Sequence, residues 1–486
     1  MFAGLDLFQE PEPSLKTKED RANTYAWRNI DYVSMRERMK AVRDHMPSPY
    51  QTEFVDKITS TTDELTPDIE AALQDIYGTS YGSDALRPAV ADWAERLEFA
   101  ATGWRPGWEA GQVDGRALIP LLHKVVQEFY RRTISEISPG LASEMQSQLK
   151  KSLDPLVTVA PTRLWGPSTM SAADVKRSCG ADVAIVSMPW TYAQHPVLWT
   201  VLSHEVGGHD IMHALGSHTC GAGLVTGLTE DIATSLEQDA SGVPPEWRPT
   251  WQTWAEEAIA DVFGMLTMGP GFTVNLCAWL SAAKAYDLYG PHVELGTLSG
   301  TIYTRFGTIV GQHPPDLLRL HVALGVLDGL KTVSGLGGMD FWPQILEDIA
   351  VDVGRGTDVL TVYETSSNAT TIQYDAYDAC SIARKVGKHL ATVQLSKLND
   401  HSLSDILRWT EEDESIALEI SKAVREGAKG VKAVRESVEN SRGFNSFTCP
   451  RIFAGANHAL YQGAATYEQA TKFVFQGISA LIPPSP

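Results

Sequence analysis

Apolar residues recur every three or four positions along most of this chain, a spacing that predicts α-helices. The spacing is helical through residues 32–101 and 117–137, and it returns after residue 250 in segments separated by glycine and proline. These later helices are predicted at residues 251–268, 274–289, 316–330, 343–353, 374–398, 403–438 and 454–481. The pattern therefore predicts a mainly α-helical protein.

Two short segments depart from this pattern. Residues 156–159 and 182–188 are β-branched runs bounded by proline and glycine, which predicts strands. The second run precedes an apolar segment at residues 196–215, which predicts a buried helix after a short connection. We therefore expect an α+β fold with a small β-sheet before this helix. The expected parts are a helical N-terminal region (1–150), a central core (151–365) and a helical C-terminal region (366–486).

The predicted buried helix carries the sequence Ser-His-Glu-Val-Gly-Gly-His, in which His204 and His209 bracket Glu205. Histidines and a glutamate in this arrangement are the parts of a metal site that activates water. On an ideal helix, positions five apart differ by about 140°, so the two rings would not face one metal. One residue looped out as a π-bulge would align them, and Gly207 and Gly208 tolerate such a distortion. The sequence thus predicts a π-type turn and one shared metal.

A third ligand is expected on the helix predicted at residues 251–268. Glu257 and Asp261 lie four positions apart there, and so on one helix face. Glu257 would bind the metal, and Asp261 would accept a hydrogen bond from a ligand histidine and so fix its tautomer. Glu256 has no acidic residue four positions further on, and it ranks second as the ligand.

A second register of the histidine motif is also possible. His209-Asp210-Ile211-Met212-His213 places two histidines four positions apart, which are aligned on a regular helix. It ranks lower, because aspartate is shorter than glutamate and reaches a metal-activated water less well. In the first register, His213 would lie behind the ligands or face the substrate.

The combination of His-Glu on one helix and Glu-x-x-x-Asp on a later one resembles the gluzincin metallopeptidases. The longer His-Glu-x-x-x-His form, followed by a doubled glutamate, is similar to the dipeptidyl peptidase III family in particular. This resemblance implies a zincin-like core that holds one Zn²⁺ per chain through His204, His209 and Glu257. It also implies that Glu205 is the general base that activates a zinc-bound water to hydrolyse peptide bonds.

Peptidases of this type place a cationic or protonatable group opposite the metal, where it stabilises the oxyanion of the tetrahedral intermediate. His313 and Arg319, in His-Pro-Pro-Asp-Leu-Leu-Arg, are candidates for that role. The alternatives are that His313 caps a turn before the two prolines and that Arg319 pairs with an acid.

The charge of the chain narrows the range of partners. Sixty acidic residues against forty basic ones produce a formal charge of −20, spread along the chain. Phosphate backbones and anionic membranes would be repelled, so we expect a peptide or small-molecule substrate and neither nucleic acid nor a membrane as partner. The five cysteines form no C-x-x-C pair, and the N-terminus lacks the pattern of a signal peptide, which favours a cytoplasmic location.

Two other functions fit the same residues. The first is a zinc enzyme of this fold that acts on a non-peptide substrate, as a hydrolase or lyase in a biosynthetic pathway. The second is a binding protein with a catalytically degenerate site.

Overall fold

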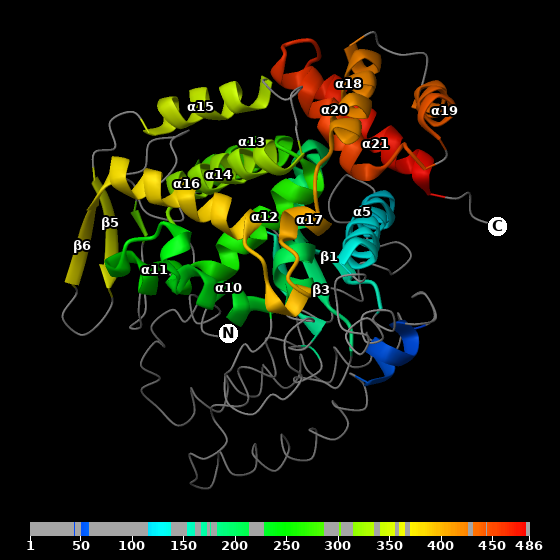
Figure 1. Ribbon diagram of the computed structural model, residues 1–486. Coiled ribbons are helices and arrows are strands. Elements are labelled where there is room, and N and C mark those ends of the chain that lie inside the picture. Colours follow the sequence, from blue (N-terminus) through cyan, green and yellow to red (C-terminus); the bar gives the residue numbers. More distant parts are fainter. Residues whose placement is uncertain are drawn as a thin grey trace, which may run out of the picture.

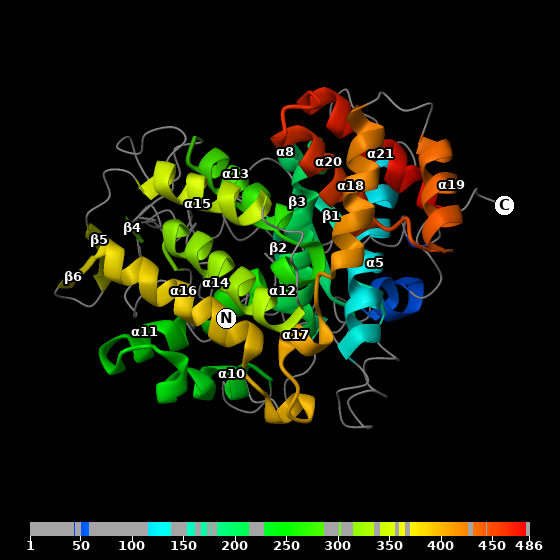
Figure 2. The same ribbon diagram turned by 45° about the horizontal axis from the view of Figure 1, so that its top comes forward.

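The computed structural model describes a large part of the chain. The described residues are 43, 50–57, 115–137, 153–160, 167–172, 175, 182–212, 228–285, 301–302, 314–334, 341–354, 359–364, 370–425, 431–443 and 445–482. They are mainly helical, as predicted, with two small sheets (Figures 1 and 2).

The predicted strands are confirmed as part of a three-stranded sheet. β1 (Leu156–Ala160) runs parallel to the central strand β3 (Ile185–Pro189). A third strand that the sequence pattern did not predict, β2 (Ser168–Met170), pairs antiparallel with the other side of β3. A strand of three residues is too short to show a periodic pattern.

The chain then passes from this sheet into the histidine motif, as predicted. The segment after β3 consists of α8 (Trp190–Ala193), the 3₁₀-helix η6 (Pro196–Val201) and the π-helix η7 (His204–Ile211). The helix α5 (Gly115–Ile137), predicted at residues 117–137, also packs against β1 and η7.

The middle of the chain is largely helical. Its elements are α10 (Leu228–Glu237), η8 (Asp239–Ser241), η9 (Pro245–Trp247), α11 (Arg248–Thr253), α12 (Ala255–Met268), α13 (Gly271–Ala285), α14 (Asp316–Ser334) and α15 (Phe341–Gly354). Before α5 lies the short π-helix η4 (Gln51–Asp56).

The C-terminal part corrects three predictions. The single helix predicted at residues 403–438 is divided into α17 (Leu403–Ile406), α18 (Glu411–Arg425) and α19 (Val431–Arg442). The helix predicted at residues 454–481 is two helices, α20 (Cys449–Tyr461) and α21 (Tyr467–Leu481), separated by a turn in which Gly463 has a φ of 64°. An apolar periodicity continues across such turns and so does not reveal them.

The third correction is a second sheet that the sequence pattern did not predict. It consists of β4 (Thr301–Ile302), β5 (Val359–Glu364) and β6 (Thr370–Asp375), and β6 leads directly into α16 (Ala376–Thr392), which η10 (Ser396–Leu398) follows. The helix predicted at residues 374–398 is therefore shorter than expected, since α16 begins after β6 and ends at Thr392. Its N-cap is Asp375, whose side chain accepts a hydrogen bond from the Asp378 amide.

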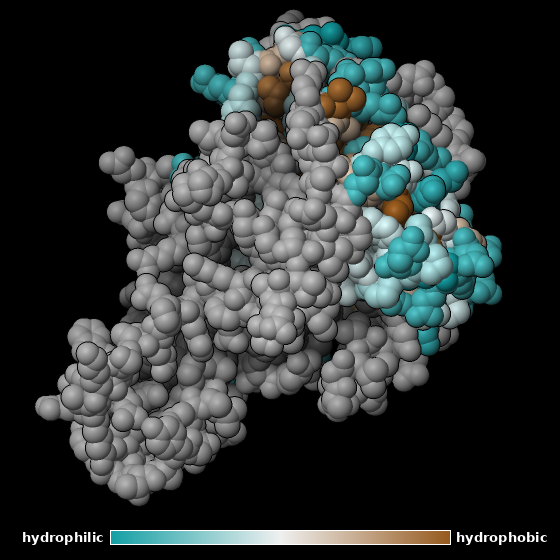
Figure 3. Space-filling view, turned by 90° about the vertical axis from the view of Figure 1, so that its left-hand side faces the viewer, coloured by the Kyte–Doolittle hydropathy of each residue, from teal (hydrophilic) through white to brown (hydrophobic). Residues whose placement is uncertain are grey.

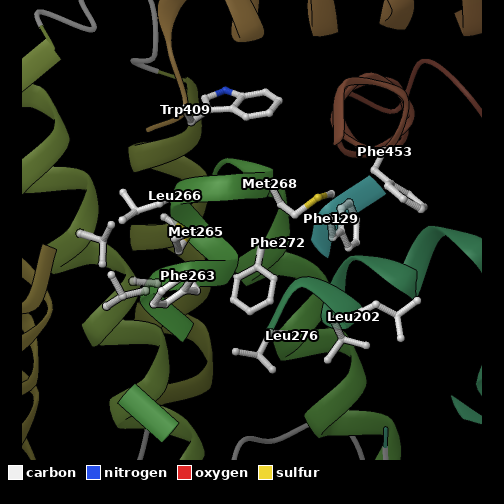
Figure 4. Packing of buried hydrophobic residues seen from close by; sticks show 14 of the residues in the cluster. Phe129, Leu202, Phe263, Met265, Leu266, Met268, Phe272, Leu276, Trp409 and Phe453 are labelled. Atoms are coloured by element: carbon white, nitrogen blue, oxygen red, sulfur yellow. The ribbon is translucent and has the colours of Figure 1, made fainter. Parts of the chain in front are cut away.

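The helix α12 lies at the centre of the fold, between α14 and the first sheet (Figures 1 and 2). Every residue of α12 except Glu256 is buried. Its apolar side chains pack against α13, α5 and α20 in the core shown in Figure 4, which includes Phe263, Met268, Phe272, Phe129 and Phe453. One apolar core includes residues from all three predicted parts. This core does not separate the parts from one another, and the division of the chain remains a prediction.

The large hydrophobic side chains that are exposed in the described part of the chain are Val351, Tyr377 and Tyr467. On the face seen in Figure 3, hydrophobic residues form small separate spots among hydrophilic ones. None of the helices in the described part of the chain combines the length and hydropathy that a membrane span requires.

Candidate metal centre

The helix that carries the two histidines is a π-helix, as predicted. The π-helical hydrogen-bond pattern covers all eight residues of η7 and is not confined to one bulged residue. A π-helix joins positions five apart, so it places His204 and His209 on one face. Their Nε2 atoms lie 3.2 Å apart.

The two glycines of the motif have a different role from the one expected. Neither Gly207 nor Gly208 has a positive φ, so the helix does not use their freedom to adopt left-handed backbone. A Cβ atom on Gly208 would instead lie 2.0 Å from the Cβ of Ala260, and one on Gly207 would lie 2.8 Å from Cδ1 of Phe263. Glycine is therefore required because η7 and α12 pack closely, and this contact brings the acids of α12 to the histidines.

The structure brings the three predicted ligands together. Glu257 Oε2 lies 3.5 Å from His204 Nε2, and Glu257 Oε1 lies 3.4 Å from His209 Nε2. One ligand atom from each of these three residues lies within 4.8 Å of the other two. Two imidazoles and one glutamate are a donor set found in catalytic zinc sites, so these residues fit a zinc ion.

Both histidine rings are held from behind by a carboxylate. Asp261 Oδ1 lies 3.0 Å from His204 Nδ1, which agrees with the role predicted for Asp261. Glu256 Oε1 lies 3.0 Å from His209 Nδ1, a contact that the sequence pattern did not predict. Adjacent helix positions differ by about 100°, so Glu256 and Glu257 approach the His209 ring from different sides.

Arg319, on α14, binds Asp261 with two N–H groups. Its Nε lies 2.8 Å from Asp261 Oδ2, and its Nη2 lies 2.7 Å from Asp261 Oδ1. Nη2 is also 3.9 Å from Glu257 Oε2, and only 3% of Arg319 is exposed. This geometry favours the alternative in which Arg319 pairs with an acid, because two of its donor groups already bind Asp261.

Glu205 is buried beside the ligands, with 5% of its surface exposed. Its Oε2 accepts a hydrogen bond of 2.8 Å from the hydroxyl of Thr169 on β2. The negative charge of Glu205 is one of the causes that raise the pKa of His209.

The electrostatics of the cluster favour a bound cation. Burial lowers the pKa of His209, but the negative charges of Glu257 and its neighbours outweigh this effect and raise the pKa to about 10. The pKa of His204 is raised in the same way, against burial, by Asp261 and Glu257. At Asp261, burial opposes ionisation, but the Arg319 guanidinium outweighs it and lowers the pKa.

The tautomers explain why the two histidine pKa values rise. If each Nδ1 donates its hydrogen to a carboxylate, each Nε2 of a neutral ring presents a lone pair. Two lone pairs and the carboxylate of Glu257 then point at one another. A proton or a metal ion between them would remove the repulsion among these acceptors. The raised pKa values agree with this arrangement, because a proton on Nε2 compensates the same acceptors that a metal ion would.

Two predicted residues lie outside the described part of the chain. His213, the second histidine of the alternative register, and His313, the candidate for oxyanion stabilisation, both remain predictions.

In comparisons with known proteins, no family model matches the chain, and no curated protein or solved structure matches it significantly. The resemblance to gluzincins therefore rests on the two motifs and on the geometry into which they fold.

Proposed function

We propose that the protein is a zinc-dependent hydrolase that cleaves peptide bonds. The observation that supports this most strongly is the convergence of His204, His209 and Glu257 from two closely packed helices. Glu205 immediately follows the first ligand, as the general base does in the gluzincins that these motifs resemble.

The residues of the chain have distinct roles in this proposal. His204, His209 and Glu257 hold the ion, while Asp261 and Glu256 orient the two rings through Nδ1. A divalent cation in this position supplies Lewis acidity, which polarises a carbonyl group and makes water more acidic.

Glu205 moves the proton. Its carboxylate takes a proton from the attacking water and passes it to the nitrogen of the leaving amine, so the group is regenerated in each cycle. Its low exposure restricts the access of bulk water, which strengthens its electrostatic interactions with the reacting groups. Arg319 acts through Asp261 in this proposal, and His313 is the candidate for stabilising the oxyanion.

Metal analysis together with the Glu205→Gln variant tests the proposal. We expect about one zinc per chain in both proteins, and cleavage of a peptide library by the wild type alone. Glu246→Gln, at an exposed glutamate on η9, is the matched control and should cleave as the wild type does. A wild type that binds zinc and cleaves no peptide would exclude a peptidase, and a wild type without stoichiometric metal would exclude any zinc enzyme.

A further inference from the structure

The strand β2 lies at the edge of the first sheet, next to the metal centre. One side of β2 pairs with β3, with Thr169 opposite Val186, and β2 also packs against η7. Successive side chains of a strand point to opposite faces, so Thr169 points away from the face that Ser168 and Met170 share.

Thr169 contacts Glu205 through its hydroxyl. The Oγ1 atom lies 2.8 Å from Oε2 of the carboxylate and 3.3 Å from the backbone oxygen of Glu205. A hydroxyl has one hydrogen to donate, and the shorter distance and the negative charge both favour the carboxylate as acceptor.

The segment after β2 makes a similar contact one turn along η7. The amide of Ala172 donates to Oδ1 of Asp210, at 3.4 Å. Glu205 and Asp210 are the residues that directly follow the two ligand histidines. The β2 segment therefore contacts the acid beside each ligand, and in this way it connects the edge of the sheet to the histidine helix.

We propose that Thr169 is a positioning residue that holds Oε2 of Glu205 and leaves Oε1 to accept a proton from water. This inference rests on the proposed hydrolytic function. A glutamate side chain has several rotatable bonds, and fixing one carboxylate oxygen selects the rotamer in which the other oxygen faces the ligands. Thr169 itself neither binds the metal nor exchanges a proton with the substrate.

The test compares three variants of the full-length zinc-loaded protein. Thr169→Val has the same shape as threonine but lacks the donor, and Thr169→Ser keeps the donor. Thr158→Val is the matched control, because Thr158 lies in the same sheet on β1 and its buried hydroxyl has no hydrogen-bond partner among the residues that the structure describes.

With a peptide substrate, Thr169→Val should lower kcat by about 10- to 100-fold, the range expected when a general base is misoriented. KM and zinc content should stay within about twofold of the wild type, since an interaction that acts on the chemical step affects kcat. Thr169→Ser and Thr158→Val should retain wild-type kcat. An unchanged kcat in Thr169→Val, or an equal loss in Thr169→Ser, would overturn the positioning role.

A second readout does not depend on peptide cleavage. The melting temperatures of Thr169→Val, Glu205→Ala and the double variant form a cycle, and the two shifts should not add, because either change removes the same hydrogen bond. If the wild type cleaves no peptide and the shifts are not additive, the contact stands and only the peptidase function fails. If the shifts are additive, the positioning role fails as well.

Discussion

Two clusters in the described part of the chain combine histidine with glutamate, and they are built in opposite ways. The first is the candidate metal centre of η7 and α12, called the metal centre below. The second, which we call the Glu414 cluster, consists of Glu414 on α18, His458 on α20, Trp342 on α15 and Trp409. Each residue of the Glu414 cluster is at most 4% exposed.

In the Glu414 cluster, two indole N–H groups converge on a carboxylate. Glu414 Oε1 accepts a hydrogen bond of 3.0 Å from Trp342 Nε1 and lies 2.5 Å from His458 Nε2, and Oε2 accepts one of 2.7 Å from Trp409 Nε1. In the candidate metal centre, by contrast, the Nε2 atoms of two imidazoles lie beside the Glu257 carboxylate, and they present lone pairs to it if each Nδ1 donates to its own carboxylate. Proximity of histidine and glutamate thus does not by itself indicate a metal site; the convergence of acceptors does.

The two clusters also differ in charge, and the metal centre carries more acidic side chains than basic ones. Around the metal centre, Glu205, Glu256, Glu257 and Asp261 are acidic, and among the described contacts Arg319 is the one basic side chain that pairs with them. An excess of negative charge at a buried site is costly unless a cation is bound there. We therefore expect changes in the metal centre to alter metal binding and changes in the Glu414 cluster to alter stability alone.

The largest effect should come from the shared ligand. Glu257→Gln replaces a charged ligand of the metal by a neutral amide, and we expect zinc affinity to fall by more than the roughly 100-fold that loss of an outer partner can cost. A competition titration with a chelator measures this change. Glu414→Gln serves as the control and should retain wild-type affinity; equal affinity in the two variants would remove the distinction between the clusters.

Glu414→Gln should instead destabilise the fold. The NH₂ group of the new glutamine would face the indole N–H of Trp342 or Trp409, each of which donates to a carboxylate oxygen in the wild type. One buried donor would then have no acceptor. We expect the free energy of unfolding to fall by about 2–4 kcal/mol. Denaturant unfolding measures the loss, and Glu412→Gln, at an exposed position of the same helix, should change it by less than about 0.5 kcal/mol. A similar stability in both variants would contradict a role for the indole hydrogen bonds.

Asp261→Asn should have an intermediate effect on the metal. It weakens the acceptor for His204 Nδ1 and removes the ion pair with Arg319, so zinc affinity should fall by about 10- to 100-fold. Glu256→Gln is a graded comparison, because the side chain of Glu256 is 25% exposed and the solvent can partly replace its contact. We expect zinc affinity to fall by less than about tenfold in Glu256→Gln. A larger loss there than in Asp261→Asn would mean that Glu256, and not Asp261, is the more important support of the ligand rings.

The last prediction needs no substitution and concerns the pH dependence of zinc binding. The pKa of His209 is raised to about 10 in the absence of metal, so a proton must leave before zinc binds. Affinity should therefore fall by about tenfold for each unit by which the pH decreases below that value. The stability of the metal-free protein depends on pH in the opposite direction from zinc affinity. The protonated His209 ring stabilises the fold fully below about pH 6.5, and this contribution is lost as the pH rises towards 10.

Chelator competition between pH 8.5 and 6.5, corrected for protonation of the chelator, tests the pH dependence. An affinity that does not change with pH would mean that no proton occupies the position of the metal.

The parts of this protein that follow from local geometry could be predicted from the sequence. The strands β1 and β3 and the π-type turn of η7 were predictable, because β-branched runs and the spacing of the two histidines act over a few residues. Glu257 was predicted as the third ligand from its spacing to Asp261 and from the resemblance to the gluzincins, and not from its distance along the chain to the histidines. The pairing of Asp261 with a ligand ring followed from its position four residues after Glu257.

The way in which these elements meet depends on tertiary packing and could not be predicted from the sequence. The contact of Gly208 with Ala260 sets the approach of η7 to α12, and the rotation of α12 in that contact places Glu256 behind His209. Thr169 and Arg319 reach the centre from an edge strand and from another helix. Such contacts join residues 36 and 58 positions apart, and no local periodicity contains information about them, because they depend on how whole elements pack.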